Sequence, residues 1–312
     1  MHDLILGIDL GGTFIKACLL DSQSRVVHAT TTPTQAAGGL DHVFARMVAL
    51  VDAICSDAGV ARERLAAIGL GVPGPLSHAK GIIHAAPNLP GWVNVPLRAR
   101  FAEATGLPVN LENDANAAAF GEFVAGAGRE VRDMVLLTLG TGVGGGILVD
   151  GHLHRGAFDN AGEIGHVIVR PQGRPCPCGQ RGCLERYASA TAVRERYAEL
   201  AGDAAPPLHD AAQVLGAATS GNHVAAQVWN DACEALALAC VNLQHTLNPE
   251  RIVMGGGMAE AGEALLQPVR EHFRANTWNV APDMPQIVAA ALGGDAGMIG
   301  AAALARGALT GR

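Results

Sequence analysis

The amino-acid sequence predicts an α/β protein made of two related lobes with a central ligand cleft. Apolar runs of strand length alternate along the chain with segments of helical period, and this alternation is typical of the class. In addition, a strand–glycine turn–strand unit occurs twice, at residues 5–20 and again at residues 134–149. Because both units have the pattern of anion-binding hairpins, we expect two lobes of related architecture that face one shared cleft.

Each predicted element follows from its local pattern. Short apolar runs bounded by glycine, proline or polar turns indicate strands, and apolar residues spaced three or four apart indicate helices. The predicted strands are 4–8, 15–20, 25–31, 65–72, 109–111, 134–139, 147–149, 251–254 and 286–292, and the predicted helices are 41–55, 115–125, 225–247 and a final one from Asp295.

The order of these elements predicts how the chain divides. Residues 1–116 form the predicted small lobe, and the C-terminal helix at 295–312 is expected to pack back on it. Residues 117–294 form the predicted large lobe, which contains a cysteine-rich loop.

Composition and charge argue against several classes of partner. The 312 residues carry a net charge of −7, and only Lys16 and Lys80 are lysines, so no basic stripe is available for a nucleic-acid backbone. No apolar run approaches the length of a membrane-spanning helix. The start, Met1-His2-Asp3, lacks the basic and apolar regions of a signal peptide. We therefore expect a soluble, cytoplasmic protein without nucleic-acid or membrane partners.

The first glycine loop, Asp9-Leu-Gly-Gly-Thr13, follows one strand and leads directly into the next. A hairpin of this kind turns successive backbone N–H groups outward and so forms an anion-binding concavity. Gly11 and Gly12 would supply such groups, and Thr13 would add a hydroxyl donor. Asp9 would hold Mg²⁺ through water. The alternative is a tight hairpin that merely requires glycine.

The second glycine loop, residues 139–146, contains a formal G-x-G-x-x-G that begins at Gly140. A dinucleotide-binding fingerprint would need a helix directly after it, whereas a strand is predicted here, and no Walker A sequence occurs. The remaining interpretation is a second phosphate-holding hairpin. The residues assigned to it are Gly140, Thr141, Gly142 and Gly144.

A third glycine cluster, Gly255-Gly-Gly257, stands between a predicted strand and a predicted helix. Gly256 and Gly257 would permit close approach of a flat ligand such as adenine, and the next helix offers its N-terminus.

An acidic residue, Asp114, stands at a strand-to-helix junction in the sequence Glu112-Asn-Asp-Ala-Asn116. A phosphoryl acceptor hydroxyl needs a carboxylate base within hydrogen-bond reach, about 2.6–3.2 Å. Asp114 suits that role, with Asn113 or Asn116 orienting the hydroxyl. The alternative is that Asp114 only caps the helix that begins at Ala115.

Three cysteines and one histidine form the strongest single pattern. Cys176, Cys178 and Cys183 lie within eight residues, and His166 stands ten residues before the first of them. This Cys₃His set has the composition of a closed, tetrahedral zinc site, and four protein ligands leave no open position for catalysis. The predicted Zn²⁺ is therefore structural.

Two glutamates, Glu163 and Glu185, bracket this metal loop. Carboxylates anchored there could accept hydrogen bonds from sugar hydroxyls. The remaining cysteines stand in apolar or helical contexts, so we expect buried packing residues and no disulfide framework. These cysteines are Cys18, Cys55, Cys233 and Cys240.

Taken in this order, the motifs resemble the ROK family of sugar kinases and repressors over nearly the whole chain. The most specific is Cys-x-Cys-Gly-x-x-Gly-Cys-x-Glu at residues 176–185, with its upstream histidine. Ala86-Pro-Asn-Leu-Pro-Gly-Trp92 also resembles a sugar-side loop common among the family's glucokinases. The other matching motifs are Asp9–Thr13, Glu112–Asn116, Gly140–Gly144 and Glu163–His166.

The resemblance implies an actin/hexokinase-like (ribonuclease H-like) fold, with ATP in the cleft and Mg²⁺ on its phosphates. It implies Asp114 as the base, a homodimer, and His166 as a ligand of both zinc and sugar. One departure is Asp159, where many members have glycine in a loop near the sugar. The implied sugar-binding residues are Gly74, Asn88, Asn113, Asp114, Glu163, His166 and Glu185. The implied residues for ATP and Mg²⁺ are Asp9, Gly11, Gly12, Thr13, Lys16, Gly140, Thr141, Gly142, Gly144, Gly256 and Gly257.

The predicted reaction is transfer of the γ-phosphoryl group of ATP to the 6-hydroxyl of a hexose, with glucose as the expected sugar. The alternatives within the family are an N-acetylhexosamine kinase, for N-acetylglucosamine or N-acetylmannosamine, and a fructose or allose kinase. A sugar-responsive repressor of this family would carry an added N-terminal helix-turn-helix region, for which the first predicted strand at Leu4 leaves no room.

Overall fold

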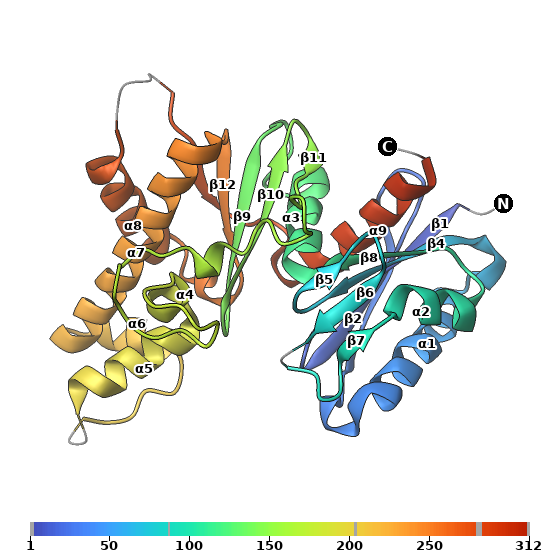
Figure 1. Ribbon diagram of the computed structural model, residues 1–312, viewed down its shortest axis with the longest axis horizontal. Coiled ribbons are helices and arrows are strands. Elements are labelled where there is room, and N and C mark those ends of the chain that lie inside the picture. Colours follow the sequence, from blue (N-terminus) through green and yellow to red (C-terminus); the bar gives the residue numbers. More distant parts are fainter. Residues whose placement is uncertain (1–2, 87, 203–204, 279–282, 311–312) are drawn as a thin grey trace. The chain divides into compact units, whose positions relative to one another are not determined.

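The computed structural model describes residues 3–86, 88–202, 205–278 and 283–310 (Figure 1). Met1, His2 and Pro87, on which predictions above depend in part, lie outside the described residues, as do 311–312 at the end of the predicted final helix. The chain forms two compact units. Unit 1 comprises Met1–Arg129, Leu153–Ala161 and Gly294–Arg312, and unit 2 comprises Glu130–His152 and Gly162–Gly293.

The main sheet of unit 1 has the strand order β3-β2-β1-β4-β8. The first three strands along the chain are antiparallel neighbours, whereas β4 runs parallel to β1 and β8 runs parallel to β4. Because of this arrangement, the carboxyl ends of β1, β4 and β8 meet at one edge of the sheet. The bounds are β1 (Leu4–Leu10), β2 (Phe14–Leu20), β3 (Val26–Pro33), β4 (Leu65–Val72) and β8 (Val109–Asn113).

The other elements of unit 1 connect or cover this sheet. A smaller sheet of three short strands, in the order β5-β6-β7, lies in the connection from β4 to β8. Its strands are β5 (Leu76–Ser77), β6 (Ile82–Ala85) and β7 (Val93–Val95). The helices are α1 (Gly39–Asp57), α2 (Leu97–Thr105), α3 (Asp114–Ala125) and α9 (Ala296–Thr310), and the short 3₁₀ turns are η1 (Ala36–Gly38), η2 (Arg62–Arg64) and η5 (Gly293–Asp295).

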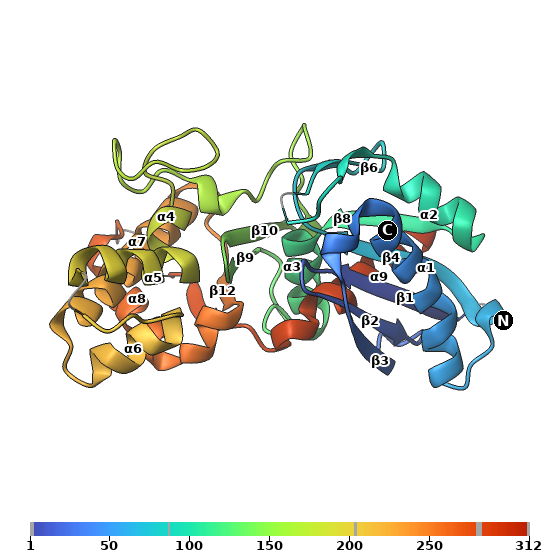
Figure 2. The same ribbon diagram turned by 90° about the horizontal axis from the view of Figure 1, so that it is seen from below.

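The two faces of the unit 1 sheet lie against different helices (Figures 1 and 2). Residues on one face of β1, such as Leu6, belong to a core cluster that includes Met47 and its neighbours on α1. The opposite face lies against α9 at very close range. A Cβ atom at Gly7 or Gly69 would overlap backbone oxygen atoms of α9, so glycine is required at both positions. Side chains alternate along a strand, and Asp9 therefore lies on the α9 face.

Helix α3 also packs along α9 within unit 1. The lobe boundary predicted after residue 116 falls inside α3, all of which belongs to unit 1. The compact unit thus extends beyond the predicted boundary, because the α3–α9 contact holds the whole helix. The division into functional lobes remains a prediction.

The sheet of unit 2 repeats the pattern of unit 1. Its order is β11-β10-β9-β12-β13, with β9 and β10 antiparallel and with β12 and β13 running parallel to β9. This repeat confirms the two related lobes predicted from the duplicated glycine unit. The bounds are β9 (Met134–Leu139), β10 (Val143–Val149), β11 (His152–Leu153), β12 (Arg251–Gly255) and β13 (Gln286–Ala289).

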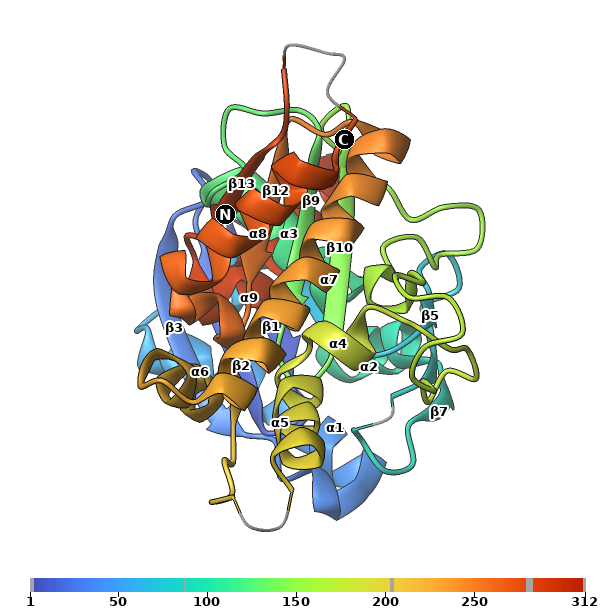
Figure 3. The same ribbon diagram turned by 90° about the vertical axis from the view of Figure 1, so that its left-hand side faces the viewer.

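The longest helix of unit 2, α7 (His223–Leu247), lies beside α8 (Glu263–Asn276), as Figure 3 shows. Residues of both helices share a core cluster with Leu137 of β9 and Ile252 of β12. No helix in the described ranges combines the length and apolar character that crossing a membrane requires. The other helices are α4 (Glu185–Ala188), α5 (Ala190–Ala201) and α6 (Ala211–Thr219), and the 3₁₀ turns are η3 (Ile164–His166) and η4 (Gly257–Ala261).

Two predicted strand boundaries differ from the structure by three residues or more and are wrong. The strand predicted at 147–149 already begins at Val143, so the glycine turn is shorter than predicted. Gly145 lies inside this strand and not in the turn. The side chain of Ile164 packs where a Cβ atom of residue 145 would stand, so this glycine is required by a close contact. The strand predicted at 286–292 ends at Ala289, although the apolar run continues beyond the last residue that pairs with β12.

Candidate functional site

Asp9 lies at the carboxyl end of β1, where its carboxylate faces the first turn of α9 at Gly297. Across the hairpin it pairs with Lys16, whose Nζ donates a hydrogen bond to the carbonyl oxygen of Gly294 at 2.7 Å. Burial raises the pKa of Asp9 to about 7; the nearby charge of Asp114 raises it further, and Lys16 opposes the rise. A carboxylate in this setting gains stability from a cation.

The turn between β1 and β2 presents backbone donors. The N–H group of Gly11 closes the hairpin by donating to the carbonyl of Phe14 at 2.9 Å, and the Thr34 hydroxyl donates to the Gly11 carbonyl at 2.6 Å. The N–H groups of Gly12 and Thr13 have no hydrogen-bond partner within the described part of the chain. Two adjacent donors of this kind match the anion-binding hairpin predicted from the sequence.

Asp114 is the first residue of α3, and the residue before it supplies the helix cap. The Oδ1 atom of Asn113 accepts hydrogen bonds from the N–H groups of Ala115 at 2.9 Å and Asn116 at 3.1 Å. Asp114 Oδ1 also accepts from Ala115 at 2.9 Å. The cap therefore does not depend on Asp114 alone, as the alternative interpretation required. Asn113 Nδ2 donates to the Gly74 carbonyl at 3.4 Å, which joins two predicted sugar-side residues.

The two predicted functional carboxylates of unit 1 are neighbours across β4. A Cβ atom placed at Gly71 would lie 3.8 Å from Asp9 Oδ1 and 3.8 Å from the Cα atom of Asp114. The ends of β1, β4 and β8 thus bring together a predicted Mg²⁺ site and a predicted base.

Glu112, which directly precedes Asn113 and Asp114, lies in a buried network that was not predicted from the sequence. Its side chain is 1% exposed. Oε1 accepts from the Asn113 backbone at 3.1 Å and from Asn116 Nδ2 at 3.0 Å, so Asn116 faces Glu112. Oε2 accepts from the guanidinium group of Arg155 at 2.7 Å, and His78 Nδ1 lies 3.5 Å away.

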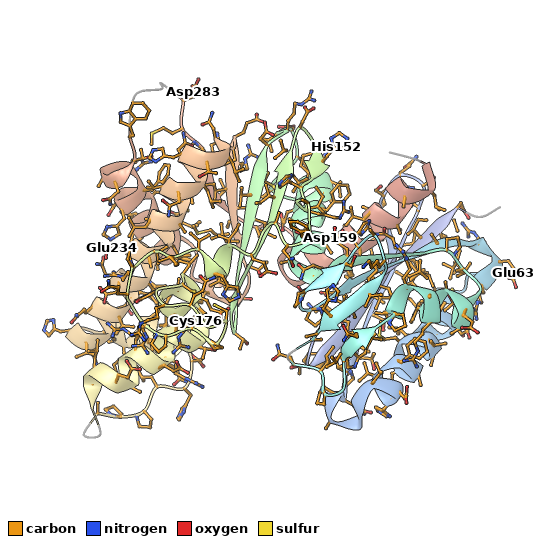
Figure 4. The ribbon with its side chains drawn as sticks, in the orientation of Figure 1. Glu63, His152, Asp159, Cys176, Glu234 and Asp283 are labelled. Carbon is orange, nitrogen blue, oxygen red and sulfur yellow. The ribbon has the colours of Figure 1, made fainter. Side chains whose placement is uncertain are left out.

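Asp159, the residue that departs from the family pattern, belongs to the same region (labelled in Figure 4). Its Oδ2 atom accepts a hydrogen bond from the backbone N–H of His78 at 2.9 Å and one from the Ser77 hydroxyl at 3.3 Å. Its carboxylate therefore fixes a backbone turn next to β5.

The second glycine loop in unit 2 is closed by a side chain. Gly140 N–H donates to the Gly142 carbonyl at 3.0 Å, and Glu185 Oε2 accepts from the Val143 N–H at 3.0 Å. The carboxylate of Glu185 also lies directly against Gly142. Glu185, predicted as a sugar ligand, thus also contacts the predicted phosphate loop, while Thr141 at the turn is exposed.

A cavity of about 530 Å³ adjoins this loop within unit 2. Its walls are mostly apolar and come from α6, α7, the loop and η4. The residues that line it include Gly140, Thr141, Leu215, Trp229, Gly257 and Met258. The cavity is large enough for a flat heterocycle, and it brings the second and third glycine clusters into one site.

His166, Cys176, Cys178 and Cys183 come together as predicted, with all four ligand atoms within 4.8 Å of one another. Cys178 Sγ lies 3.7 Å from Cys183 Sγ, and His166 Nδ1 lies 3.7 Å from Cys176 Sγ. Atoms about 2.3 Å from a tetrahedral zinc are about 3.8 Å apart, so the four side chains fit the ion. Cys176 is labelled in Figure 4.

The remaining predicted residues occupy exposed loops. Asn88 is exposed. A Cβ atom added at Gly12 would lie 3.3 Å from the Cβ atom of Asn88, so Asn88 borders the first glycine hairpin. Glu163 is exposed directly before η3, and Gly256 is exposed before η4 with a positive φ of 81°. The other four cysteines are buried, as predicted.

A family model described as the ROK family matches residues 5–308 of the chain. The chain belongs to the ROK family. A relative named glucokinase from Halalkalibacterium halodurans is 39% identical to this ROK protein over 306 residues, which cover 95% of this chain and 92% of the relative.

Solved structures of ROK proteins share the fold. A ROK hexokinase from Thermus thermophilus has a TM-score of 0.85 and 34% identity, covering 99% of this chain and all of the other. A ROK family glucokinase from Streptomyces griseus, in complex with glucose and AMPPNP, has a TM-score of 0.81 and 33% identity, covering 97% of this chain and 99% of the other. These likenesses confirm the predicted two-lobed, actin/hexokinase-like fold of this ROK protein.

Proposed function

We propose that this ROK protein is a glucokinase that transfers the γ-phosphoryl group of ATP to the 6-hydroxyl of glucose. The observation that carries the proposal is the closeness of Asp9 and Asp114 on either side of Gly71, in a chain similar over nearly its full length to a glucokinase.

The chemistry follows from what phosphoryl transfer requires. Little covalent work is asked of the protein, so the reaction depends on positioning and on charge stabilisation. Asp114 accepts the proton of the 6-hydroxyl, and Asp9 would hold the Mg²⁺ that neutralises charge on the phosphates. The donors at Gly12 and Thr13, the second glycine loop and Lys16 bind phosphate oxygens. In unit 1, the N–H groups of Gly12 and Thr13 belong to the hairpin that also carries Asp9 and Lys16. In unit 2, Glu185 supports the second glycine loop. Both observations support these roles.

The cavity beside the second glycine loop is the proposed nucleotide-base site. Its apolar walls suit the adenine ring, and Gly257 lets the backbone approach it closely. This assignment places the base and the phosphates of ATP against the same loop, because Gly140 and Thr141 border both.

The metal loop is the proposed support of the sugar site. Zn²⁺ bound by the three cysteines and Nδ1 of His166 would fix the ends of the loop that carry Glu163 and Glu185. The other ring nitrogen of His166 would then meet a sugar hydroxyl, as would Asn113 and Asn88. We further propose a cytoplasmic homodimer, on the family resemblance.

Initial rates with MgATP and a panel of sugars test the proposal. The panel comprises glucose, N-acetylglucosamine, N-acetylmannosamine, fructose and allose. We expect the highest kcat/KM for glucose, with glucose 6-phosphate as product. A higher kcat/KM for another sugar would change the substrate, and no turnover of any sugar would overturn the kinase assignment.

A further inference from the structure

Residues 153–161, which we call the anchored segment, belong to unit 1, although the chain directly before and after them belongs to unit 2. After Leu153 the segment forms no helix or strand. Within it, Ala161 N–H donates to the Arg155 carbonyl at 2.9 Å, and Asn160 Nδ2 donates to the Phe158 carbonyl at 2.9 Å. The large apolar side chain of Phe158 adds no packing to the segment, since it is 85% exposed. Its order in unit 1 therefore depends on polar side chains.

The first attachment is the ion pair between Arg155 and Glu112. Two guanidinium nitrogens lie 2.7 Å from Glu112 Oε2, which is buried. The other oxygen, Oε1, holds the Asn113 backbone and the Asn116 side chain at the start of α3. One buried carboxylate thus joins the segment to the helix that begins with Asp114, and each of its oxygens has partners.

The second attachment is Asp159, whose carboxylate accepts hydrogen bonds from Ser77 and His78. Asp159 has a φ of 59°, a left-handed conformation that is unfavourable for a residue other than glycine. The surrounding structure must therefore stabilise this conformation, and the two hydrogen bonds do so.

We propose that Glu112 and Asp159 are positioning residues that set the affinity for the sugar by fastening the anchored segment to unit 1. The inference rests on the proposed function, because it assigns a sugar site to the residues that follow. The chain leaves the segment at Ala161 and reaches Glu163 two residues later, while Glu112 directly precedes Asn113 and Asp114. Both attachments therefore act on elements that carry proposed sugar contacts.

Binding of ATP should not depend on these attachments. The first glycine hairpin is supported by Thr34, and the second by Glu185, and neither of these residues contacts the anchored segment through a hydrogen bond in the described part of the chain. Loosening the segment should therefore change the KM for glucose and leave the KM for ATP nearly unchanged.

Hydrogen exchange of the whole protein tests the attachments directly. Arg155→Met removes the first and Asp159→Gly removes the second, and glycine also relieves the left-handed backbone. We expect peptides that cover 153–161 to exchange at least about tenfold faster in each variant. Arg64→Met is the matched control, because Arg64 is likewise paired with a carboxylate, Asp3, at 2.6 and 3.0 Å, at the opposite end of the β1–β4 pair. Unchanged exchange in both variants would overturn the proposal.

Steady-state kinetics test the consequence for sugar binding. Losing charge-assisted hydrogen bonds should raise the KM for glucose about 10–100-fold in Arg155→Met, while the KM for ATP changes less than about twofold. Glu112→Gln places an amide donor against Arg155, and the double variant Glu112→Gln/Arg155→Met removes that conflict. If Arg155 acts through Glu112, the double variant should bind glucose no more weakly than Glu112→Gln alone.

The outcomes separate the proposals from each other. Equal rises in both KM values, with a matching loss of melting temperature, would show a merely structural role and overturn the inference. If the unaltered protein fails to phosphorylate glucose, the proposed function fails, and with it the sugar role of the attachments. The exchange experiment still decides whether the attachments hold the segment.

Discussion

The carboxylate of Glu185 accepts a hydrogen bond from the backbone N–H of Val143, and this bond ties the first turn of α4 to the second glycine loop. The two residues stand 42 positions apart in the sequence, so no local pattern could predict the contact. Because Glu185 is also a proposed sugar ligand, one side chain links the sugar site to the phosphate loop within unit 2.

Glu185→Gln and Glu185→Ala should separate these two roles. Glutamine keeps an oxygen that can accept from Val143, so we expect a weaker affinity for glucose with a nearly unchanged KM for ATP. Alanine removes the acceptor and leaves the loop unsupported, so the KM for ATP should also rise, by about tenfold. Steady-state kinetics measure both values. If the two variants have the same KM for ATP, the link between Glu185 and the loop has no functional role.

Asp114→Asn should abolish most turnover and leave binding intact. Asparagine retains the shape of the side chain and cannot accept the proton of the sugar hydroxyl, so kcat should fall by about 10²–10⁴-fold. Calorimetric titration with glucose and a melting curve serve as controls, and both should match the unaltered protein, because Asn113 supplies the helix cap. A variant with unaltered kcat would show that another group is the base.

Asp9→Asn should stabilise the protein without nucleotide more at pH 8 than at pH 5. The folded-state pKa of Asp9 is about 7, above its ordinary value of 3.8, so the native state binds this proton more tightly than the unfolded chain does. The contribution of Asp9 to stability therefore declines as pH rises from about 4 to 7. Asp114 and Lys16 are the charged groups that act on it.

Melting temperatures across pH 5–8, without Mg²⁺ or ATP, measure this effect. The difference between Asp9→Asn and the unaltered protein should grow with pH, and by pH 8 it should reach a few degrees. A difference that is constant over this range would mean that Asp9 is ionised throughout.

Zinc removal should weaken glucose binding far more than ATP binding. In small zinc modules the metal contributes about 10–16 kcal/mol of apparent folding free energy, and the loop from His166 to Cys183 contains no helix or strand beyond η3. The glycine hairpins contain none of the four ligands. Chelation, or Cys178→Ser, should therefore disorder the loop while the nucleotide site persists.

Calorimetry with each ligand, metal analysis and circular dichroism check this prediction. Cys55→Ser is the control, since this buried thiol of α1 is outside the cluster. Equal losses for both ligands would mean that the metal supports the whole unit, and an absence of bound metal in the purified protein would contradict the zinc site.

Local patterns predicted the hairpins, the repeat and the metal cluster, because each depends on residues close together in the chain. The four predicted zinc ligands, for example, span His166 to Cys183, and the chemistry of these side chains is specific. The Glu112–Arg155 pair could not be predicted in this way. Its partners stand 43 residues apart, and only the crossover that returns residues 153–161 to unit 1 brings them together.

The α9 face of the unit 1 sheet shows what this chain connectivity means for biosynthesis. On the ribosome, Gly7 and Gly69 emerge early, whereas the helix that they accommodate begins only at Ala296. A nascent chain therefore exposes an apolar sheet face while all the strands of unit 2 are being made, and such faces attract chaperones and favour aggregation. The strands β1–β8 of unit 1 are translated before every strand of the unit 2 sheet, and unit 1 is nevertheless completed after them, because it needs α9.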